Sequence, residues 1–483
     1  MKEVTRIKKQ IILSYLPRIV NFFVVPLQIA LLTKTFSVEE YGVWSLLLSF
    51  GFIVTMIFTF GLQKLLGVKI PGKPYLIQLK YLKSILLAET VIYIVVSFVF
   101  VLIFLDHFLT LFNLAEYEDS FKTIVFIFLI NLVYNEFGRF FNYTKRIELR
   151  IYSTVLEKIL EFLLLYIAIK ILNIQSINNL VYIYAFVYTF LLFVNLYFFR
   201  DLSLLLKIKI NRKIIKLSFF FGLPLAFSDI AWKLIQNLDL YMLSYFDKKI
   251  ELGIYSFISK LLNYVYLAGS PVIWVFYPYI AERYNKNGKE LNRAIKHLVY
   301  NQTKFSLTLA VLAIGIVVIN LEKIVNLIAT SEYLNYTNAY FLYSFYPIIL
   351  ILLYINQQFV LLKGDTKNVG LSYFLGLSIN FIGNLLLIPY AGIYGAIVAS
   401  MVSIVSIIVL QAKAVNIFAL IPLKLLAFVF IQYCFIYLLF SIDIAIFYKN
   451  LLFLSFFVFA LFLLKIVYLN DLRIYWEKLW EKF

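Results

Sequence analysis

The chain is poor in the residues from which most catalytic and metal sites are built. Its 483 residues include one cysteine and two histidines, His107 and His297, which lie far apart. A lone cysteine excludes a disulfide framework within the chain and a cysteine metal site, and separated histidines argue against a histidine metal centre. The sequence also has no glycine-rich nucleotide loop, metal-ligand cluster or nucleophile–base spacing. We therefore expect no metal, no cofactor and no enzymatic activity.

Charge is scarce as well. Only 14% of the residues are charged, whereas 63% are apolar and 19% are aromatic. Soluble domains carry roughly 25% charged and about 45–50% apolar residues, so this chain lacks the polar side chains to face water on all sides. Lipid is the remaining solvent, and in lipid the backbone must satisfy its own hydrogen bonds. The composition predicts an all-α polytopic membrane protein.

Apolar runs follow one another along almost the whole chain. A helix of roughly 20 residues crosses about 30 Å of hydrocarbon, and the runs predict about fourteen such helices. Their ranges are 11–35, 41–66, 82–105, 121–144, 152–172, 177–199, 214–246, 251–280, 295–320, 335–362, 368–388, 391–413, 420–442 and 448–469. The polar stretches between them are too short for a soluble domain.

Lysine and arginine concentrate in every second connection. The segments 64–83, 145–150, 200–216 and 283–296 are rich in both residues, whereas the alternate connections hold few. Basic residues of short loops stay on the cytoplasmic side, so this alternation predicts an even number of spans with both termini in the cytoplasm. It also accounts for the net charge of +18 without a nucleic-acid partner.

Two turns along the chain resemble each other. Residues 36–45 and 246–256 both read phenylalanine, a polar patch, glutamate, then a glycine and a serine among aliphatic and aromatic residues. The repeat predicts two pseudo-symmetric six-helix lobes, 1–210 and 211–415, around a central cavity, as in many transporters. Residues 416–483 would add two helices and a cytoplasmic tail. The alternative is that any short external turn favours glutamate and glycine.

Several motifs carry a resemblance to a known family. They are Tyr41-Gly-Val-Trp-Ser, Gly222-Leu-Pro-Leu, Asp239-Leu-Tyr-Met-Leu-Ser, Gly253-Ile-Tyr-Ser and Ile388-Pro-Tyr-Ala-Gly-Ile-Tyr-Gly-Ala. In their order and spacing over the whole chain, they resemble the polysaccharide flippases (Wzx-like exporters of O-antigen and capsule units). These flippases belong to the multidrug/oligosaccharidyl-lipid/polysaccharide exporter superfamily.

The resemblance implies a function and a set of partners. It implies alternating access in a bacterial inner membrane, with an undecaprenyl-diphosphate-linked oligosaccharide, such as an O-antigen unit for lipopolysaccharide, as the substrate. Membrane lipids, a coupling proton or sodium ion, and the polysaccharide polymerase and chain-length proteins are the other partners to expect.

Polar residues recur within four of the apolar runs at offsets of three, four and seven, which place each set on one side of a helix. The sets are Ser14, Arg18 and Asn21; Asn131, Asn135, Arg139 and Asn142; Asp229, Lys233 and Gln236; and Ser256, Lys260 and Asn263. Ionisable groups within spans usually face a bundle interior or a water-filled cavity. Four such stripes predict a wet central cavity.

Basic residues in that cavity would hold an anionic diphosphate, because arginine and lysine both bind phosphate, and amides would serve sugar hydroxyls. The predicted substrate-binding residues are Arg18, Arg139, Lys233, Lys260, Asn21, Asn135 and Asn263. An alternative is that some charges only neutralise each other, as Asp229 and Lys233 would do at a spacing of four.

Carboxylates inside the spans suggest ion coupling. Glu89, Asp229 and Asp239 are the candidates, since a buried carboxylate can exchange its proton as a cavity opens to either side. Structural charge pairing is the alternative for each of them.

Two other functions compete with the flippase. An ion-coupled multidrug or cation antiporter of the same superfamily would favour carboxylates and aromatics and twelve spans, whereas the basic stripes and two further helices favour a lipid-linked substrate. A flippase for the peptidoglycan precursor would share those features, so the sequence separates it poorly. A membrane polymerase or ligase would need a long external loop, which the chain lacks.

Overall fold

The computed structural model describes residues 2–144, 146–199, 201–286, 293–412 and 423–466. Within these ranges the regular structure is helical and contains no strand. Ten of the described helices are long and apolar enough to cross a membrane, or eleven if the bent α10 is counted. The predicted class, an all-α polytopic membrane protein, is confirmed.

The chain groups into two compact units. Unit 1 comprises Met1–Ser256, Ile328–Tyr333 and Asn384–Ala396, and unit 2 comprises Phe257–Leu327, Leu334–Gly383 and Ile397–Phe483. The helices α11 (Lys249–Lys286) and α16 (Thr366–Ala412) contribute to both. The division into six-helix lobes at residues 210 and 415 stays a prediction.

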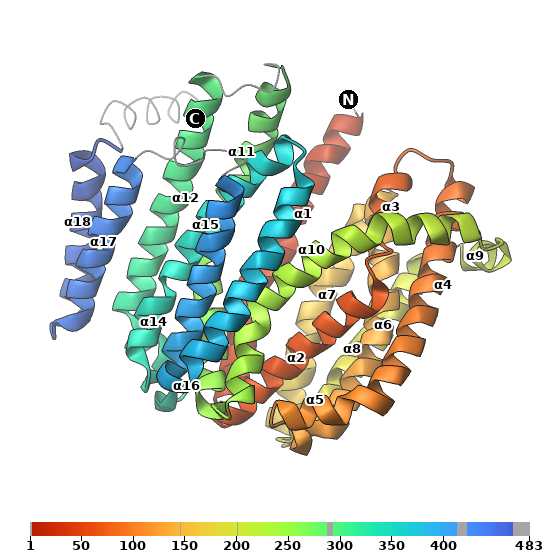
Figure 1. Ribbon diagram of the computed structural model, residues 1–483, viewed down its shortest axis with the longest axis horizontal. Helices are drawn as coiled ribbons and strands as arrows, with labels where there is room; N and C mark the ends of the chain where they lie inside the picture. The colour runs from red at the N-terminus through yellow and green to blue at the C-terminus, as the bar shows by residue number, and fades with distance from the viewer. Residues whose placement is uncertain (1, 145, 200, 287–292, 413–422, 467–483) are drawn as a thin grey trace. The chain divides into compact units, whose positions relative to one another are not determined.

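Unit 1 is built around α6, which packs against α2, α4, α7 and α8, while α1 packs against α7. The bent helix α10 crosses α2, α3 and α4 (Figure 1). The elements are α1 (Lys2–Thr33), α2 (Val38–Thr59), α3 (Lys64–Lys69), α4 (Tyr75–Val99), η1 (Phe100–Phe104), α5 (Leu105–Leu111), η2 (Ala115–Tyr117), α6 (Glu118–Tyr143), α7 (Ile147–Tyr166), η3 (Ile167–Ile171), α8 (Ile177–Phe199), α9 (Leu202–Lys207) and α10 (Arg212–Tyr245).

In unit 2, α12 packs against α15, α17 and α18. Its elements besides parts of α11 and α16 are α12 (Arg293–Ile319), most of α13 (Leu321–Ile328), α14 (Thr337–Tyr343), α15 (Phe345–Leu362), α17 (Leu423–Ser441) and α18 (Ile446–Leu463). The short η4 (Ser331–Leu334) lies at the boundary between the two units. At Gly315, α12 and α18 approach each other closely, since an added Cβ would lie 2.0 Å from the ring of Phe453.

The long helix α16 is a helical hairpin and therefore holds two of the predicted spans. Its backbone turns at Gly392, where φ is 52° and ψ is −128°. The two arms lie side by side, because Asn380 donates to Ser400 (3.0 Å) and Gln411 donates to Ser372 (3.0 Å). Each arm has the length that one crossing of about 30 Å requires.

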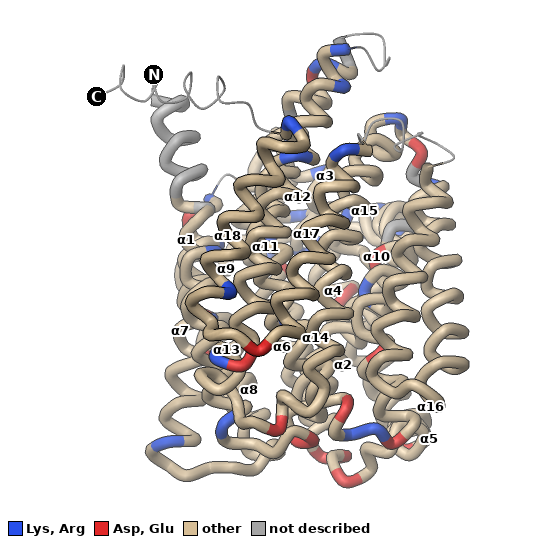
Figure 2. Tube along the Cα trace, turned by 90° about the vertical axis from the view of Figure 1, so that its left-hand side faces the viewer, with Lys and Arg blue, Asp and Glu red and all other residues tan. Residues whose placement is uncertain are grey.

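Segments expected on the cytoplasmic side meet at one end of unit 1. Tyr75 at the start of α4 donates to Asp201 (2.6 Å), and Lys83 donates to the backbone oxygen of Leu206 (2.6 Å). The backbone N–H of Asn211 bonds Ser84 (3.0 Å). Figure 2 shows basic residues gathered near the ends of the helices. These contacts bring the three segments together, and the side of the membrane that they face stays a prediction.

The two similar turns meet at the other end of unit 1. A Cβ added at Gly42 would lie 2.7 Å from the backbone nitrogen of Gly253, and one added at Gly253 would lie 1.9 Å from the carbonyl oxygen of Val38. Only glycine allows two helices to approach so closely. Within the first of these turns, Ser37 and Glu40 form a capping box that starts α2.

Two matching hydrogen bonds flank this glycine contact. The hydroxyl of Thr33, at the end of α1, donates to the carbonyl of Ile328 (2.6 Å). The hydroxyl of Ser244, at the end of α10, donates to the carbonyl of Phe112 (2.5 Å). Thr33 and Ser244 each lie at the end of the helix that precedes one of the two similar turns. Each hydrogen bond therefore joins that helix end to a residue far away in the sequence.

Candidate functional site

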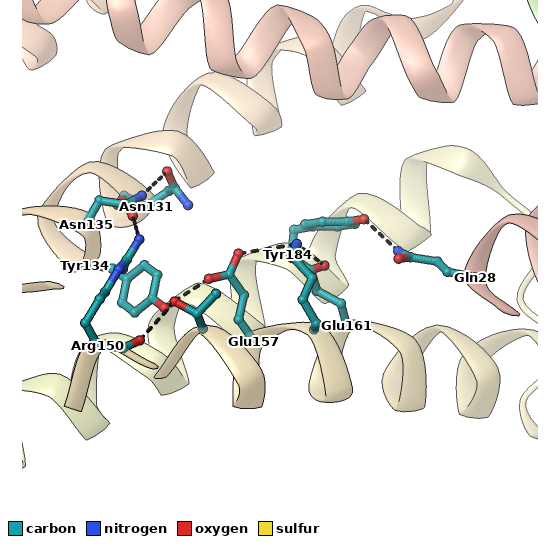
Figure 3. A network of polar contacts seen from close by, with 10 residues as sticks. Gln28, Asn131, Tyr134, Asn135, Arg150, Glu157, Glu161 and Tyr184 are labelled. Atoms are coloured by element: carbon teal, nitrogen blue, oxygen red, sulfur yellow. Dashed lines mark hydrogen bonds and ion pairs between the residues drawn. The ribbon is translucent and has the colours of Figure 1, made fainter. Parts of the chain in front are cut away.

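A charged and polar network runs through the helices of unit 1, and Arg150 lies near one end of it (Figure 3). Its Nη2 donates to Asn135 (3.0 Å), whose own amide donates to Asn131 (2.8 Å). The guanidinium lies over the ring of Tyr134, 5.5 Å from the centroid. A Cβ added at Gly138 would lie 2.4 Å from Nη1, so glycine there makes room for the arginine.

Arg150 differs from the other cations of this network in its partners. Among the described residues it forms no ion pair, and its Nη1 is buried without a hydrogen-bond partner. A guanidinium held by neutral amides and a ring keeps its full charge for another anion.

The network continues along α7 through two carboxylates and one lysine. Tyr134 donates to Glu157 (3.0 Å), and Lys158 lies between Glu157 (3.4 Å) and Glu161 (2.8 Å). The side chain of Glu161 is only 3% exposed. Asn195 of α8 fixes the neighbouring helices by accepting from Ser153 and donating to the backbone of Tyr134. When ionised, the three charged groups carry one net negative charge.

At its far end the network reaches α1. Gln28 donates to the hydroxyl of Tyr184 on α8 (3.3 Å), as Figure 3 shows. The ring of Tyr184 in turn packs against Trp44 of α2. The network therefore touches α1, α2, α6, α7 and α8.

A second group of charges joins α4 to α6. Arg139 forms an ion pair with Glu136 on the same helix. Glu89 of α4 is fully buried, and its Oε1 accepts a hydrogen bond from the backbone N–H of Gln63 (2.8 Å). Two residues of the predicted set, Arg139 and Glu89, thus belong to one cluster.

The predicted residues of α10 take separate partners. Asp229 forms an ion pair with Lys64 of α3, which is far away in the sequence. Lys233 lies over the ring of Phe52 on α2, 5.9 Å from its centroid. The alternative pairing of Asp229 with Lys233 is therefore not the one that the structure shows.

The predicted residues of α1, Arg18 and Asn21, form none of the contacts described above for α4, α6 and α10. Arg18 is exposed and stacks on the ring of its neighbour Tyr15 at 5.6 Å, while Asn21 is partly buried. The two side chains lie three residues apart along the helix, about one turn.

Asp239 is a structural anchor by its contacts. It is 1% exposed, and it accepts hydrogen bonds from Tyr255 and from the amide of Asn384 (2.8 Å). It thereby joins α10, α11 and the tip of the α16 hairpin. Nearby, Glu251 accepts from the backbone N–H of Ile393 at the same tip.

The remaining two residues of the predicted set, Lys260 and Asn263, belong to unit 2. Both lie on α11, where Lys260 is partly buried and Asn263 is exposed. The roles of all the predicted residues stay predictions, since the structure shows their positions and contacts and not a bound substrate.

Sequence reasoning missed Arg150 as a site residue because it lies near a basic connection and was counted among the loop charges. Its stripe on α7 provides the available signal: Arg150, Glu157, Lys158 and Glu161 follow at offsets of seven, eight and eleven, on one side of a helix. Tyr134 carried no signal, because one buried tyrosine among 37 looks like any other.

Comparisons with known proteins agree with this architecture. The fold is similar to that of "Lipid II flippase MurJ, inward closed conformation", with a TM-score of 0.71, 14% identity, and coverage of 96% of this chain and 99% of that chain. It is also similar to an inward-facing multidrug resistance MATE family transporter of the MOP superfamily, with a TM-score of 0.64, 11% identity, and coverage of 85% and 98%. The protein thus has the fold of a MOP-superfamily transporter.

The family follows from the sequence itself. Residues 7–283 match the model of the polysaccharide biosynthesis protein family, and the chain belongs to that family. No curated protein matches the chain in sequence. The resemblance to polysaccharide exporters of this superfamily, predicted from the turn motifs, is confirmed at the level of family and fold.

Proposed function

We propose that this protein is a flippase that moves an undecaprenyl-diphosphate-linked oligosaccharide, such as an O-antigen or capsule unit, across a bacterial inner membrane. It works by alternating access, with both termini in the cytoplasm, and it catalyses no covalent reaction. The family match supports polysaccharide biosynthesis, and the fold supports transport.

The observation that carries this proposal is the environment of Arg150. Its guanidinium has no carboxylate partner among the described residues, while Arg139 and Lys158 do. A diphosphate accepts the planar fork of an arginine, and the amides Asn131 and Asn135 beside it suit sugar hydroxyls. Unit 1 thus presents, at Arg150, a cation without a carboxylate partner in the described chain and with neutral polar groups around it.

The other predicted residues extend the same proposal. Arg18, Lys233 and Lys260 add positive charge along the path of the headgroup, and Asn21 and Asn263 add hydrogen bonds to sugars. Arg139 contributes less, because Glu136 already neutralises it.

The comparison of folds favours a lipid-linked substrate over a small cation. The lipid II flippase structure covers 96% of this chain, whereas the MATE transporter covers 85%. The peptidoglycan precursor is the second candidate substrate for this reason, since it too presents a diphosphate and a sugar on a polyprenyl tail.

Complementation of a bacterium without its own O-unit flippase tests the proposal. Wild-type protein should restore surface polysaccharide, and R150A should lower that restoration about 10-fold or more, because a charge-assisted hydrogen-bonded pair is lost. K122Q is the matched control, since Lys122 pairs with Glu118 at an exposed site. Insertion is checked by the amount of full-length protein in the membrane.

The same strain set separates the alternatives. Full activity of an inserted R150A would contradict the cationic site. Rescue of a strain depleted of its lipid II flippase, without rescue by O-units of several sugar compositions, would identify the peptidoglycan precursor as the substrate. Ion-driven efflux of small cations without either rescue would show an antiporter.

A further inference from the structure

The cluster formed by Glu89, Glu136 and Arg139 has an imbalance of charge that the flippase proposal does not use. Glu89 and Glu136 are both 0% exposed, and Arg139 pairs with Glu136 alone. With both carboxyl groups ionised the cluster would carry one net negative charge inside the helices. Such a charge is expensive to bury without a counter-charge.

The two carboxyl groups lie close enough to share a proton. Helices α4 and α6 pack against each other, and the two carboxyl groups act on each other electrostatically. One oxygen of each, Oε2 of Glu89 and Oε2 of Glu136, is buried and receives no donor from the described residues. Two carboxylates cannot hydrogen-bond unless one of them carries a hydrogen, and adjacent carboxyl groups commonly hold a single proton between them.

The charged and titratable neighbours come from three other helices. α6 brings Glu136, Arg139 and Tyr143, and α7 brings Arg150, which acts on Glu136 through space while it is bonded to Asn135. α3 brings Lys64, which is occupied by Asp229 of α10. The charged residues of α2 are Glu39 and Glu40 at its start, and that of α9 is Lys207 at its end.

The chemistry of the cluster fits a proton better than a metal cation. Hard cations such as Ca²⁺ and Mg²⁺ take six or more oxygen ligands, and a neighbouring guanidinium repels them. The described residues contain no group of three or more His, Cys, Asp or Glu side chains that could hold a metal ion. Two free carboxyl oxygens beside an arginine suffice for a proton.

The cluster is connected to a break between two helices. α2 ends at Thr59, and the chain turns through Phe60 and Gly61, both at positive φ (50° and 66°), before α3 begins. Glu89 holds this turn through the N–H of Gln63. A carboxylate accepts this bond more strongly than a neutral carboxylic acid does.

The same break contacts α10. A Cβ added at Gly222 would lie 2.4 Å from the carbonyl oxygen of Gly61, and one added at Gly61 would lie 2.8 Å from the side chain of Ala226. Any change in the turn therefore reaches α10, whose Asp229 is also tied to α3 through Lys64.

We propose that Glu89 and Glu136 form a binding site for one proton, and that this proton controls how firmly the break between α2 and α3 is held against α10. Uptake of the proton from water neutralises the cluster and weakens the bond from Gln63. Return of the proton to water strengthens that bond. The proposal concerns the coupling ion and does not depend on the identity of the transported substrate.

Infrared difference spectroscopy of the full-length protein in lipid nanodiscs tests the proton directly. At neutral pH we expect a carbonyl band from a protonated buried carboxyl group. E89Q and E136Q should each remove the part of the band that belongs to this pair, because the remaining glutamate then balances Arg139 one to one. Any part that comes from Glu157 and Glu161 should stay in both variants. E118Q is the matched control and should keep the band, since Glu118 is exposed and paired with Lys122.

Two results would overturn the proton site. One is a wild-type spectrum without that band at neutral pH, or with a band that neither variant weakens. The other is a signal from the pair that follows the sodium concentration and not pH, which would replace the proton with a sodium ion.

Hydrogen exchange of the peptide that contains residues 60–69 tests the link to the break. Above the pH at which the wild-type band disappears, E89Q should exchange about tenfold faster than wild type, the difference between a charge-assisted and a neutral hydrogen bond. E136Q should exchange no faster than wild type, because it leaves Glu89 ionised. Equal exchange in E89Q and wild type would refute the coupling, and neither measurement relies on transport.

Discussion

The two units stabilise their interiors with different polar chemistry. The five ion pairs seen between described side chains all lie in unit 1, on α3, α6, α7 and α10. Unit 2 uses neutral amides: Gln302 donates to Gln358 (2.9 Å), and both donate to the carbonyl of Ile273 (3.1 and 3.2 Å).

This difference separates charged groups that can respond to pH from an amide network that cannot. Carboxylates and their partners respond to pH and to a charged ligand, so the arrangement of unit 1 can follow either one. The amide pair Gln302–Gln358 and the amide–hydroxyl pair Asn380–Ser400 keep the same hydrogen bonds at every physiological pH. Unit 1 therefore has the chemistry of a responsive element, and the described amide network of unit 2 that of a fixed support.

The largest effect should come from removing the lysine between two carboxylates. In K158M, Glu157 and Glu161 lose their only ion-pair partner, and breaking a buried pair costs about 3–5 kcal/mol. The native state then retains a proton that the unfolded chain has released, so stability falls as pH rises. Thermal unfolding in detergent at pH 5 and pH 8 measures this, and a loss that does not grow with pH would contradict it.

An intermediate effect is expected in unit 2. Q302L leaves the amide of Gln358 with one partner fewer and removes a bond to Ile273, which costs about 1–3 kcal/mol. Because no titratable group is involved, the same loss should appear at pH 5 and pH 8. A strong pH dependence in Q302L would break the distinction between the two units. Q302N, which keeps the amide, serves as the control.

The smallest effect should follow from replacing one carboxylate by its amide. E161Q leaves Glu157 and Lys158 as a balanced pair and keeps the shape of the side chain, so the stability should change by less than about 1 kcal/mol. The expected unfolding temperature is close to that of wild type at both pH values. A loss as large as that of K158M would show that the carboxylate, and not the balance of charge, holds α7 in place.

The class of fold could be predicted from the sequence because it depends on composition and on the length of apolar runs. Each of the fourteen predicted ranges overlaps helix in the described residues, and the ranges 368–388 and 391–413 are the two arms of α16. The range 41–66 is interrupted by the break between α2 and α3, which was not predicted. The predicted boundary between the two α16 ranges, at residues 388–391, lies next to the turn at Gly392. These features are local, so a single sequence contains them.

The partners of the charges could not be predicted in the same way. A spacing of four made Lys233 a reasonable partner for Asp229, but the structure pairs Asp229 with Lys64 on another helix. Contacts between distant helices depend on how the helices are rotated, which one sequence does not fix. The pair Arg139 and Glu136 lies within one helix at a spacing of three, so a single sequence does contain a signal for it, although Arg139 was predicted to bind substrate.

The contact between Gly42 and Gly253 has a consequence for biosynthesis. Unit 1 also needs Ile328–Tyr333 and Asn384–Ala396, so its packing is incomplete until the ribosome has passed residue 396. At about 5–20 residues per second, the interval from residue 256 to residue 396 lasts roughly 7–28 seconds. During that time the end of unit 1 at which Gly42 meets Gly253 lacks two of its hydrogen bonds, because Thr33 has no Ile328 and Asp239 has no Asn384 to bond.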